Sequence, residues 1–408
     1  MILRYLSLIV LTVVFIMSNA YDIHALEPEE LFSETAIVID TKSGDILYEK
    51  DSDRKMYPAS ITKIVTAIIA IEDGDLQEIV TVSKNARNQD GSRVYLLEGE
   101  QLTLEKLLLG LMINSGNDAG TAIAEHFDRS ERAFAKRMNT FVKEKIGTED
   151  TNFTNPHGLF HPDHVTTAKD MAKITNYAMK NDTFREIVGT KVIDWVGEGW
   201  ETTLYNHHRL LWDYEGTTGV KNGYVPESGH TLVTSAQKNG MELIAVTMNA
   251  SSKYYSYYDT MALLDYGFQN FTTEMINKGQ LLADAMGQEY MLAKNIYVAK
   301  QEDDSIKLAV SKDKQLVVQI GNEEKIKEDV LVEQKKNDLN PVPSKNTNVS
   351  ASIELQVEKE SNFITIVLVF IGLCMIILIV SVFQKKRRRK KMQERYTHSI
   401  AYSRRSRN

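Results

Sequence analysis

A serine and a lysine three positions apart are the first residues in this sequence whose types and spacing can support covalent catalysis. Ser60 lies two residues after Pro58 and directly before residues 61–71. These residues would be apolar on nearly every face of a helix, which is typical of a buried one. Residues i and i+3 of a helix share a face, so the Ser60 hydroxyl and the Lys63 amine should be neighbours. Burial, helped by a second nearby cation, would lower the pKa of Lys63 well below its ordinary value. A neutral amine beside a hydroxyl is a general base beside a nucleophile.

The Ser-x-x-Lys spacing is weak evidence by itself, because it recurs along the chain. The other pairs are Ser52/Lys55, Ser235/Lys238 and Ser311/Lys314. Only Ser60 follows closely on a proline and precedes an apolar helix. The alternative makes Ser60 a helix N-cap and Lys63 a side chain whose stem packs inside while its amine reaches water. The motif alone leaves both interpretations open.

Two more polar triplets lie between predicted elements. Ser115-Gly116-Asn117 falls between the helical segments 104–113 and 118–127, where a loop can present a hydroxyl and an amide. Its alternative is a helix C-cap followed by an N-cap. Lys221-Asn222-Gly223 precedes a predicted hairpin. Its alternative is an Asn-Gly turn, like the same triplet at residues 238–240.

The elements that must position these groups indicate an antiparallel sheet flanked by helices. Hairpins are predicted for residues 35–40 with 46–49, and for residues 231–236 with 241–248. Helical periodicity fills the interval between them, at residues 59–72, 104–113, 118–127 and 167–179. Strands at both ends of a helical insertion predict a sheet whose edges are distant in sequence. The expected fold is therefore an α/β (α+β) sandwich over residues 30–268.

The chain changes character after residue 269. Alternating apolar and polar residues at 296–298, 306–310 and 316–320 are separated by charged turns, which predicts a small all-β domain. Residues 337–348 are rich in Pro, Asn and Ser and suit a spacer. We assign residues 269–360 to this small β domain and a membrane-proximal spacer.

Both ends of the chain predict export and membrane anchoring. Residues 1–20 have the basic start, the apolar core and the small-residue cleavage site of a signal peptide, with cleavage after Ala20 or, less favourably, Ala25. Residues 363–383 are uncharged and, at about 1.5 Å per residue, long enough for a transmembrane helix. The basic segment 384–408 follows, and the positive-inside rule places it in the cytoplasm. The part between the two ends would then lie on the outer face of the cell membrane.

Composition excludes several other classes of protein. The content of 43% apolar and 25% charged residues among 408 is that of a globular protein, which excludes wholesale disorder. A single cysteine, Cys374, excludes an intrachain disulfide. Residues 384–408 hold 11 basic residues and one acidic one, so the rest has 37 basic against 54 acidic residues. This acidic part argues against a nucleic-acid partner, and the basic tail suits a topology signal or a contact with anionic lipid.

The order and spacing of the three motifs resemble those of serine penicillin-binding proteins and class A β-lactamases. Flanking residues narrow the resemblance to the low-molecular-weight D-alanyl-D-alanine carboxypeptidases. These flanking segments are Pro58-Ala59-Ser60-Ile61-Thr62-Lys63, Ser115-Gly116-Asn117-Asp118-Ala119, Phe153-Thr154-Asn155-Pro156-His157-Gly158-Leu159 and Leu243-Ile244-Ala245-Val246. The resemblance covers roughly residues 30–268. It implies a β-lactamase/transpeptidase-like fold and a serine-type hydrolase that needs no cofactor and no metal.

The resemblance also implies roles for individual residues. Ser60 would attack the carbonyl of a D-alanyl-D-alanine bond of a peptidoglycan stem peptide, and Lys63 would take its proton. Ser115 would relay a proton to the leaving D-alanine. Asn117 would bind the substrate amide and orient Lys63.

Three more roles belong to the third motif. Lys221 would hold the terminal carboxylate and keep Lys63 neutral. Gly223 completes the motif, and the backbone N–H groups of Ser60 and Tyr224 would form the oxyanion hole. β-Lactams would acylate the same serine.

The third motif departs from the family at one position. The family usually has Thr where this chain has Asn222, and Val225 replaces a second hydroxyl-bearing residue. Asn can donate through its amide but is longer and prefers turns. Losing one charge-assisted hydrogen bond would cost about 1.5 to 3 kcal/mol. A catalytically impaired wall-binding or sensing protein is therefore one alternative function, and a β-lactamase is another.

Two further clusters receive no role in catalysis. His157, His161 and His164 lie within eight residues, but no nearby cysteine or carboxylate completes a convincing set of metal ligands, so we expect a loop role for them. The tyrosines in residues 254–258 could stack on sugar rings, but packing at a helix start is the favoured interpretation.

Overall fold

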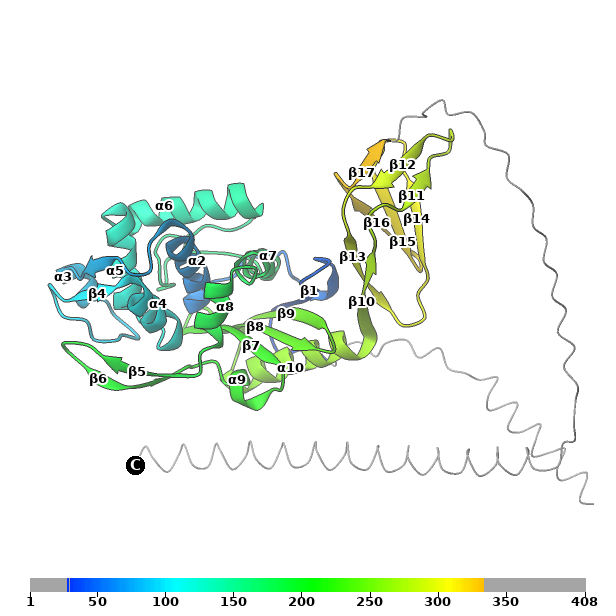
Figure 1. The fold of residues 1–408 in the computed structure, drawn as a ribbon. Helices are drawn as coiled ribbons and strands as arrows, with labels where there is room; N and C mark the ends of the chain where they lie inside the picture. The colour runs from blue at the N-terminus through cyan, green and yellow to red at the C-terminus, as the bar shows by residue number, and fades with distance from the viewer. Residues whose placement is uncertain (1–27, 29, 334–408) are drawn as a thin grey trace, which may run out of the picture. The chain divides into compact units, whose positions relative to one another are not determined.

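The computed structural model describes residue 28 and residues 30–333, and Figure 1 labels its elements. The predicted signal peptide, the spacer at residues 337–348, the transmembrane segment 363–383 and the basic tail lie outside the described residues. No helix in the described part of the chain combines the length and the apolarity needed to cross a bilayer.

A five-stranded antiparallel sheet in the order β2-β1-β9-β8-β7 forms the centre of the fold. Its strands are β1 (Thr35–Asp40), β2 (Ile46–Lys50), β7 (Thr217–Val225), β8 (Gly229–Lys238) and β9 (Met241–Ala250). β1 pairs with β9 along its whole length, from Thr35 opposite Met248 to Asp40 opposite Leu243. The two edge strands, β2 and β7, are far apart in sequence, so the predicted antiparallel sheet is confirmed.

The two predicted hairpins are present, but a third strand extends the second one. Asn239 and Gly240 have φ values of 51° and 81°, as a tight turn between β8 and β9 requires. The other Lys-Asn-Gly triplet is not a turn, because residues 221–223 lie inside β7 and pair with β8. Cross-strand pairing therefore overrides the local turn preference of Asn222 and Gly223.

Most of the regular elements between β2 and β7 are helices. They are η1 (Ala59–Thr62), α2 (Lys63–Asp73), α3 (Lys84–Arg87), α4 (Leu104–Ile113), α5 (Asn117–Asp128), α6 (Glu131–Phe141), η2 (Val142–Ile146), α7 (Ala168–Ala178), α8 (Asp182–Gly189) and α9 (Leu210–Asp213), and α10 (Lys253–Asn270) follows β9. Short hairpins are formed by β3 (Ile79–Thr81) with β4 (Gln101–Thr103), and by β5 (Val192–Val196) with β6 (Glu201–Tyr205). The four predicted helical segments are confirmed with small shifts of their ends.

Side-chain caps explain where several of these helices begin. The hydroxyl groups of Thr103, Ser130, Thr167 and Ser252 each accept a hydrogen bond from a backbone N–H in the first turn of α4, α6, α7 and α10. These bonds satisfy N–H groups that have no partner within the helix.

The helices cover both faces of the sheet. Helix α10 lies against one face, and α2, α7 and α8 lie against the other (Figure 1). Strand β9 shows this division residue by residue: Leu243 and Ala245 pack in the cluster that includes α10, whereas Ile244 and Val246 pack in the cluster that includes α2. A strand buried on both faces reads as a continuous apolar run, as residues 243–246 do.

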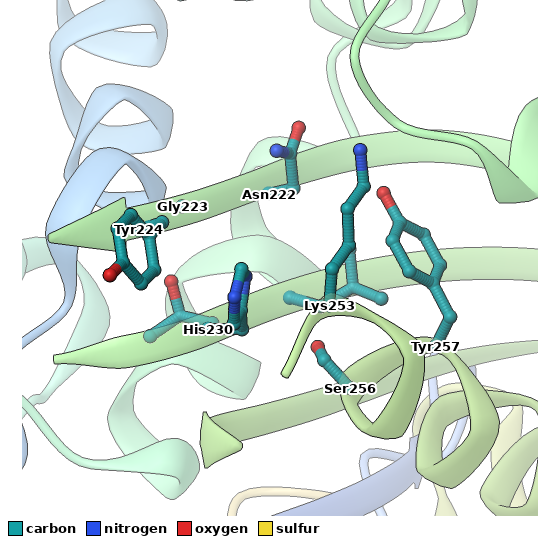
Figure 2. Close-up of a pocket in the computed structure, with 9 residues that line it drawn as sticks. Asn222, Gly223, Tyr224, His230, Lys253, Ser256 and Tyr257 are labelled. Carbon is teal, nitrogen blue, oxygen red and sulfur yellow. The ribbon is translucent and has the colours of Figure 1, made fainter. Parts of the chain in front are cut away.

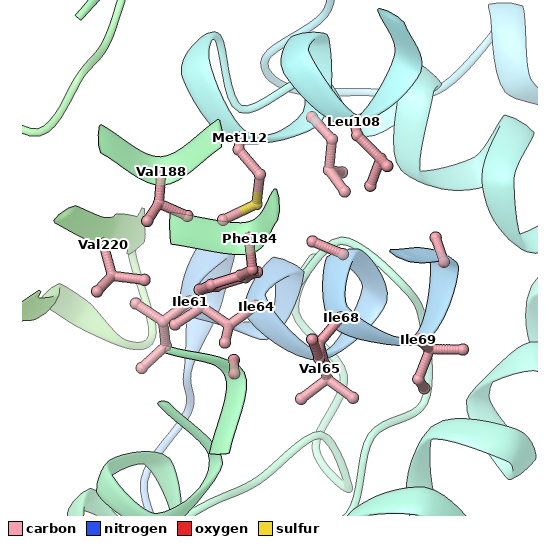
Figure 3. Packing of buried hydrophobic residues seen from close by; sticks show 14 of the residues in the cluster. Ile61, Ile64, Val65, Ile68, Ile69, Leu108, Met112, Phe184, Val188 and Val220 are labelled. Carbon is pink, nitrogen blue, oxygen red and sulfur yellow. The ribbon is translucent and has the colours of Figure 1, made fainter. Parts of the chain in front are cut away.

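Helix α2 passes through the larger of these two cores. Its residues 63–70 are all buried, so the predicted central helix is confirmed. Figure 3 shows Ile64 and Ile68 packed among side chains that include Leu108, Met112 and Phe184. Each fully buried side chain of this size contributes about 1.5–3 kcal/mol. This packing fixes the helix whose first turn carries the predicted nucleophile and base.

The residues after α10 form only strands within the described part of the chain. These strands are β10 (Phe271–Ile276), β11 (Leu281–Ala283), β12 (Glu289–Leu292), β13 (Ile296–Gln301), β14 (Ile306–Val310), β15 (Leu316–Ile320), β16 (Glu323–Lys327) and β17 (Leu331–Glu333). They pair as β10-β13, β11-β12-β17 and β14-β15-β16 around a small apolar core that includes Val298 and Val318.

Candidate active site

Ser60 and Lys63 lie side by side at the start of the central helix. Ser60 belongs to the 3-10 turn η1, and Lys63 is the first residue of α2. The Lys63 amine lies 3.0 Å from the Ser60 hydroxyl oxygen. Lys63 is fully buried, whereas Ser60 retains some exposure to solvent. The interpretation of Lys63 as a lysine with its amine in water is therefore wrong.

The Lys63 amine has two further contacts, both with oxygen acceptors. It lies 2.8 Å from Oδ1 of Asn117, at the start of α5, and 2.6 Å from the backbone carbonyl oxygen of His157. A neutral amine has two N–H donors and one lone pair. When Asn117 and His157 accept the two N–H groups, the lone pair remains for the proton of the Ser60 hydroxyl.

Burial and a neighbouring charge favour this neutral form. Burial lowers the pKa of Lys63 well below its ordinary value, and the positive charge of Lys221 lowers it further, whereas Asp118 acts in the opposite direction. Burial also lowers the pKa of Lys221, to about 7. The structure thus has the electrostatic environment that the sequence predicts for a lysine base.

The Ser115-Gly116-Asn117 segment joins α4 to α5 and brings Asn117 to Lys63. Ser115 has a φ of 61°, an unusual conformation for a residue with a side chain. The Asn117 backbone N–H donates to the Ser92 carbonyl at 2.7 Å, and its side-chain amide donates to the Asp90 carbonyl at 2.6 Å. In the described residues, the Ser115 hydroxyl makes no hydrogen bond with Ser60, Lys63 or Lys221. Its role as a proton relay stays a prediction.

Strand β7 brings the third motif against the turn that carries Ser60. Lys221 is 1% exposed, and its amine donates to the Asn222 carbonyl at 3.0 Å. A Cβ atom at Gly223 would lie 2.7 Å from the Ser60 backbone nitrogen and 2.6 Å from the Thr231 hydroxyl oxygen. Only a residue without a side chain fits at this position, because both neighbours are held in place.

Asn222 carries an unusual feature for a residue in a strand. Its side-chain oxygen Oδ1 is buried and has no hydrogen-bond partner within the described part of the chain. A buried acceptor without a partner costs about 1 to 3 kcal/mol. Beyond it, Tyr224 is 56% exposed and packs on the ring of His230, with ring centroids 4.6 Å apart. Asn222 therefore places an unpartnered polar atom in the middle of the third motif.

A second close backbone contact supports the turn that carries Ser60. Ala59 has a φ of 49°, and Gly158 has a φ of 91°. A Cβ atom at Gly158 would lie 1.9 Å from the Ala59 carbonyl oxygen. The Thr231 hydroxyl donates to the Pro58 carbonyl at 2.9 Å. The turn that carries Ser60 is therefore held between the loop at 153–159 and strand β8.

A cavity of about 210 Å³ lies beside β7. It is lined by residues of β7, β8 and the start of α10, which are Asn222, Gly223, Tyr224, His230, Thr231, Leu232, Lys253, Ser256 and Tyr257. Figure 2 shows the Lys253 side chain rising from α10 toward β7, with its amine on the same side of the strand as the Asn222 side chain. Lys253 is a candidate ligand for an anionic group.

Sequence reasoning missed Lys253. The only signal was its position directly after Ser252, a residue that can begin a helix. Burial lowers the pKa of Lys253, and so does the positive charge of Arg209.

The two clusters without a predicted catalytic role are used in packing and in loop structure. His164 lies 2.8 Å from the Thr62 hydroxyl oxygen and accepts a hydrogen bond from the Thr154 backbone N–H, and burial lowers its pKa to about 3. Near the start of α10, the Tyr255 ring stacks on Phe32 with centroids 4.0 Å apart.

Comparisons with known proteins agree with this arrangement. A family profile described as D-alanyl-D-alanine carboxypeptidase matches residues 22–252, more than half of the chain and all the motif residues. The chain belongs to the D-alanyl-D-alanine carboxypeptidase family. The family is one of hydrolases, and the predicted resemblance is confirmed.

Individual relatives cover the same part. The D-alanyl-D-alanine carboxypeptidase DacF of Bacillus subtilis is 35% identical over 253 residues, which are 60% of this chain and 64% of that protein. The chain thus matches just under two thirds of the length of DacF. Penicillin binding protein 5 from Haemophilus influenzae has a TM-score of 0.66 at 26% identity, over 76% of this chain and 97% of that one.

A third protein covers a shorter part of the chain. The Streptomyces K15 DD-transpeptidase has a TM-score of 0.57 at 29% identity, over 60% of this chain and all of that one.

Proposed function

We propose that this chain is a D-alanyl-D-alanine carboxypeptidase that removes the terminal D-alanine from peptidoglycan stem peptides through an acyl-enzyme on Ser60. One observation carries the proposal: the buried Lys63 amine lies 3.0 Å from the Ser60 hydroxyl oxygen and has acceptors for both of its N–H groups. The family of the chain and the names of its relatives support the substrate class.

The acylation step follows from these contacts. The lone pair of Lys63 takes the proton of the Ser60 hydroxyl while its oxygen attacks the carbonyl carbon of the D-alanyl-D-alanine bond. The C–N bond then breaks, and the proton that Lys63 took up passes to the leaving amine of D-alanine, with Ser115 as the proposed relay, so that Lys63 is neutral again. Water attacks the ester next, which releases the shortened peptide and restores Ser60.

The developing negative charge needs two N–H donors. The close approach of Gly223 to the Ser60 backbone nitrogen supports a site between η1 and β7. The backbone N–H groups of Ser60 and Tyr224 are the proposed donors, and each is expected to contribute about 3 to 4 kcal/mol to stabilisation of the transition state.

The edge position of β7 suits a peptide substrate. An extended peptide can pair with an edge strand of a sheet, and its register then places the scissile carbonyl at a fixed point along the strand. The terminal carboxylate of the substrate would meet positive charge from Lys221 and Lys253. The amide of Asn222 is the proposed uncharged donor to the same carboxylate.

Labelling with a fluorescent penicillin and assay of D-alanine release test this proposal on the full chain in detergent. We expect one label at Ser60 and release of D-alanine from diacyl-Lys-D-Ala-D-Ala. Ser60→Ala should lose both, whereas Ser311→Ala, a control in another Ser-x-x-Lys pair, should keep both. A Ser60→Ala protein that retains both activities would refute the assignment.

The same assay distinguishes the two alternative functions. A wall-binding or sensing protein would bind peptidoglycan without releasing D-alanine, an outcome favoured by the unpartnered side-chain oxygen of Asn222. A β-lactamase would hydrolyse the penicilloyl ester within seconds, whereas a carboxypeptidase would retain it. The lifetime of the label on Ser60 therefore separates a β-lactamase from a carboxypeptidase.

The proposed location of the enzyme is the outer face of the cell membrane. The signal-like residues 1–20, the apolar segment 363–383 and the basic residues 384–408 of the sequence support a single-pass anchor with the catalytic part outside. Protease added to intact protoplasts should digest the catalytic part and leave a protected C-terminal fragment. Recovery of the whole protein in the soluble fraction would overturn this topology.

A further inference from the structure

The direction of the Lys63 lone pair depends on two acceptors that come from separate segments. Asn117 belongs to α5, and His157 belongs to the loop before α7. If either acceptor moves, an N–H group of Lys63 loses its partner and the lone pair no longer points steadily at Ser60. The structure must therefore hold these two oxygen atoms in a fixed relation to each other.

The His157 side chain connects its own loop to helix α6. Its Nδ1 accepts a hydrogen bond from the Leu159 backbone N–H at 3.3 Å, so the ring proton lies on Nε2. His157 is 3% exposed, and its Nε2 lies 3.3 Å from Oε1 of Glu131, the first residue of α6. Nε2 makes no hydrogen bond of good geometry in the part of the chain that the structure describes, and the Glu131 carboxylate is the charged group that it faces.

Glu131 also contacts the helix that carries Asn117. The Thr121 hydroxyl donates a hydrogen bond to Oε1 of Glu131. Thr121 lies four residues after Asn117, one turn further along α5. One carboxylate thus contacts both segments that supply acceptors to Lys63.

We propose that Glu131 is a positioning residue, which holds Asn117 through Thr121 and the His157 carbonyl through the His157 ring, and so aims the lone pair of Lys63 at Ser60. This inference rests on the proposed function, because it assigns Lys63 the role of base. Glu131 itself touches neither the substrate nor the reacting atoms.

Charge states in this network are consistent with the role. Burial lowers the pKa of His157, which keeps its ring neutral. Burial acts to raise the pKa of Glu131, but the close contact with His157 and the hydrogen bond from Thr121 outweigh it and leave the pKa lowered, so the carboxylate is charged. The charged groups that face Lys63 from other elements are Lys221 of β7 and Asp118 of α5. Changes at Glu131 leave both of them in place.

The test compares Glu131→Ala, Glu131→Gln and the control Glu125→Ala in the full-length protein. Glu125 is a matched control because it also accepts a hydrogen bond from a hydroxyl, that of Ser83, and another from Asn85. Glu131→Ala should lower kcat and the rate of penicillin acylation by about 10- to 100-fold, as expected for misplacement of a reacting group, and change KM by less than about threefold. Glu131→Gln keeps an acceptor and should remain within about threefold of the parent.

A second measurement reads Lys63 directly and does not depend on activity. The NMR signal of the Lys63 side chain is followed as a function of pH in protein labelled with ¹³C-lysine. The signal is assigned as the one that is missing from the spectrum of Lys63→Met. Loosened acceptors admit water, which weakens the effect of burial, so Glu131→Ala should move deprotonation of Lys63 to higher pH. Glu125→Ala should not move it.

The outcomes separate the inference from the proposed function. An unchanged Lys63 titration in a folded Glu131→Ala protein overturns the inference, whatever the activity. An active parent whose kcat is unchanged in Glu131→Ala also overturns it. A parent that neither takes up penicillin nor releases D-alanine refutes the proposed function instead, and the titration still decides the role of Glu131. If Glu131→Ala does not fold, the Lys63 titration is measured in Glu131→Gln and in Thr121→Val instead. We then expect a shift in Thr121→Val and none in Glu131→Gln.

Discussion

Gly223 and Ser60 approach each other so closely that a methyl group on Gly223 would stand 2.7 Å from the Ser60 backbone nitrogen. The contact joins an edge strand of the sheet to the turn that carries Ser60. Glycine is therefore required at this position by the close approach to Ser60, and not by the conformation of the strand.

Gly223→Ala should reduce acylation of Ser60 by about 100-fold or more, because the added methyl group must displace the backbone that supplies an oxyanion donor. Gly240→Ala is the control. Gly240 has a φ of 81° in the β8-β9 turn and no atom within 4 Å of an added Cβ, so it should lose stability without losing activity. Stopped-flow measurement of penicillin uptake gives both rates. Equal rates in the two variants would contradict the proposed oxyanion hole.

The two lysines should give the acylation rate a bell-shaped dependence on pH. Lys63 must be neutral, so the acylation rate should fall at low pH, in the acid limb. Lys221, with a pKa of about 7, must be charged, so the rate should also fall at high pH, in the alkaline limb. Lys221→Gln removes a charge that lowers the pKa of Lys63. The acid limb should therefore move to higher pH, and the alkaline limb should disappear. Acylation rates measured across the pH range check both changes, and an acid limb that moves to lower pH would exclude this coupling.

Asn222→Thr should increase kcat/KM for D-alanine release by about 10- to 100-fold, because a hydroxyl donor to the substrate carboxylate replaces an amide whose oxygen is buried without a partner. Asn239→Thr is the matched control in the other Lys-Asn-Gly triplet. Asn239 has a φ of 51°, so a β-branched residue should cost about 1 to 2 kcal/mol of stability there and leave kcat/KM unchanged. An unchanged kcat/KM in Asn222→Thr would show that Asn222 does not limit turnover.

Lys253→Gln should raise KM about tenfold for a peptide with a free terminal carboxylate, because one positive charge near the cavity beside β7 is lost. The same peptide with an amidated terminus should show little difference between the parent and the variant. Lys42→Gln serves as the control, since Lys42 bonds the Gly240 carbonyl at an exposed turn. An equal loss for both peptides would assign Lys253 a structural role.

Local patterns in the sequence were sufficient for the parts of this fold that local forces determine. Helix α2 has a continuous run of apolar residues, which is typical of a buried helix. Residues 239–240 are an Asn-Gly pair, which favours the tight turn of a hairpin. The Ser60–Lys63 pair follows from helical spacing. These features depend on residues near one another in the chain.

The remaining features depend on contacts between distant segments. Residues 217–225 have a turn-like triplet at their centre, and only pairing with β8 makes them a strand. The acceptor that His157 offers to Lys63 is a backbone carbonyl, which every residue has and no sequence pattern marks. Lys253 reaches the cavity because α10 packs on the sheet against β8 and β9, and the cavity that its first residues line extends to β7.

The pairing of β1 with β9 has a consequence for how the chain acquires its structure. Residues 35–40 are made early, yet the partner that covers one side of them, residues 241–250, is made some 200 residues later. The sheet cannot close, and β7 cannot be held against the turn that carries Ser60, before that late partner exists. Folding should therefore be slow and all-or-none for this part, and a product that stops short of residue 241 should be removed by proteases rather than persist as a partly active enzyme.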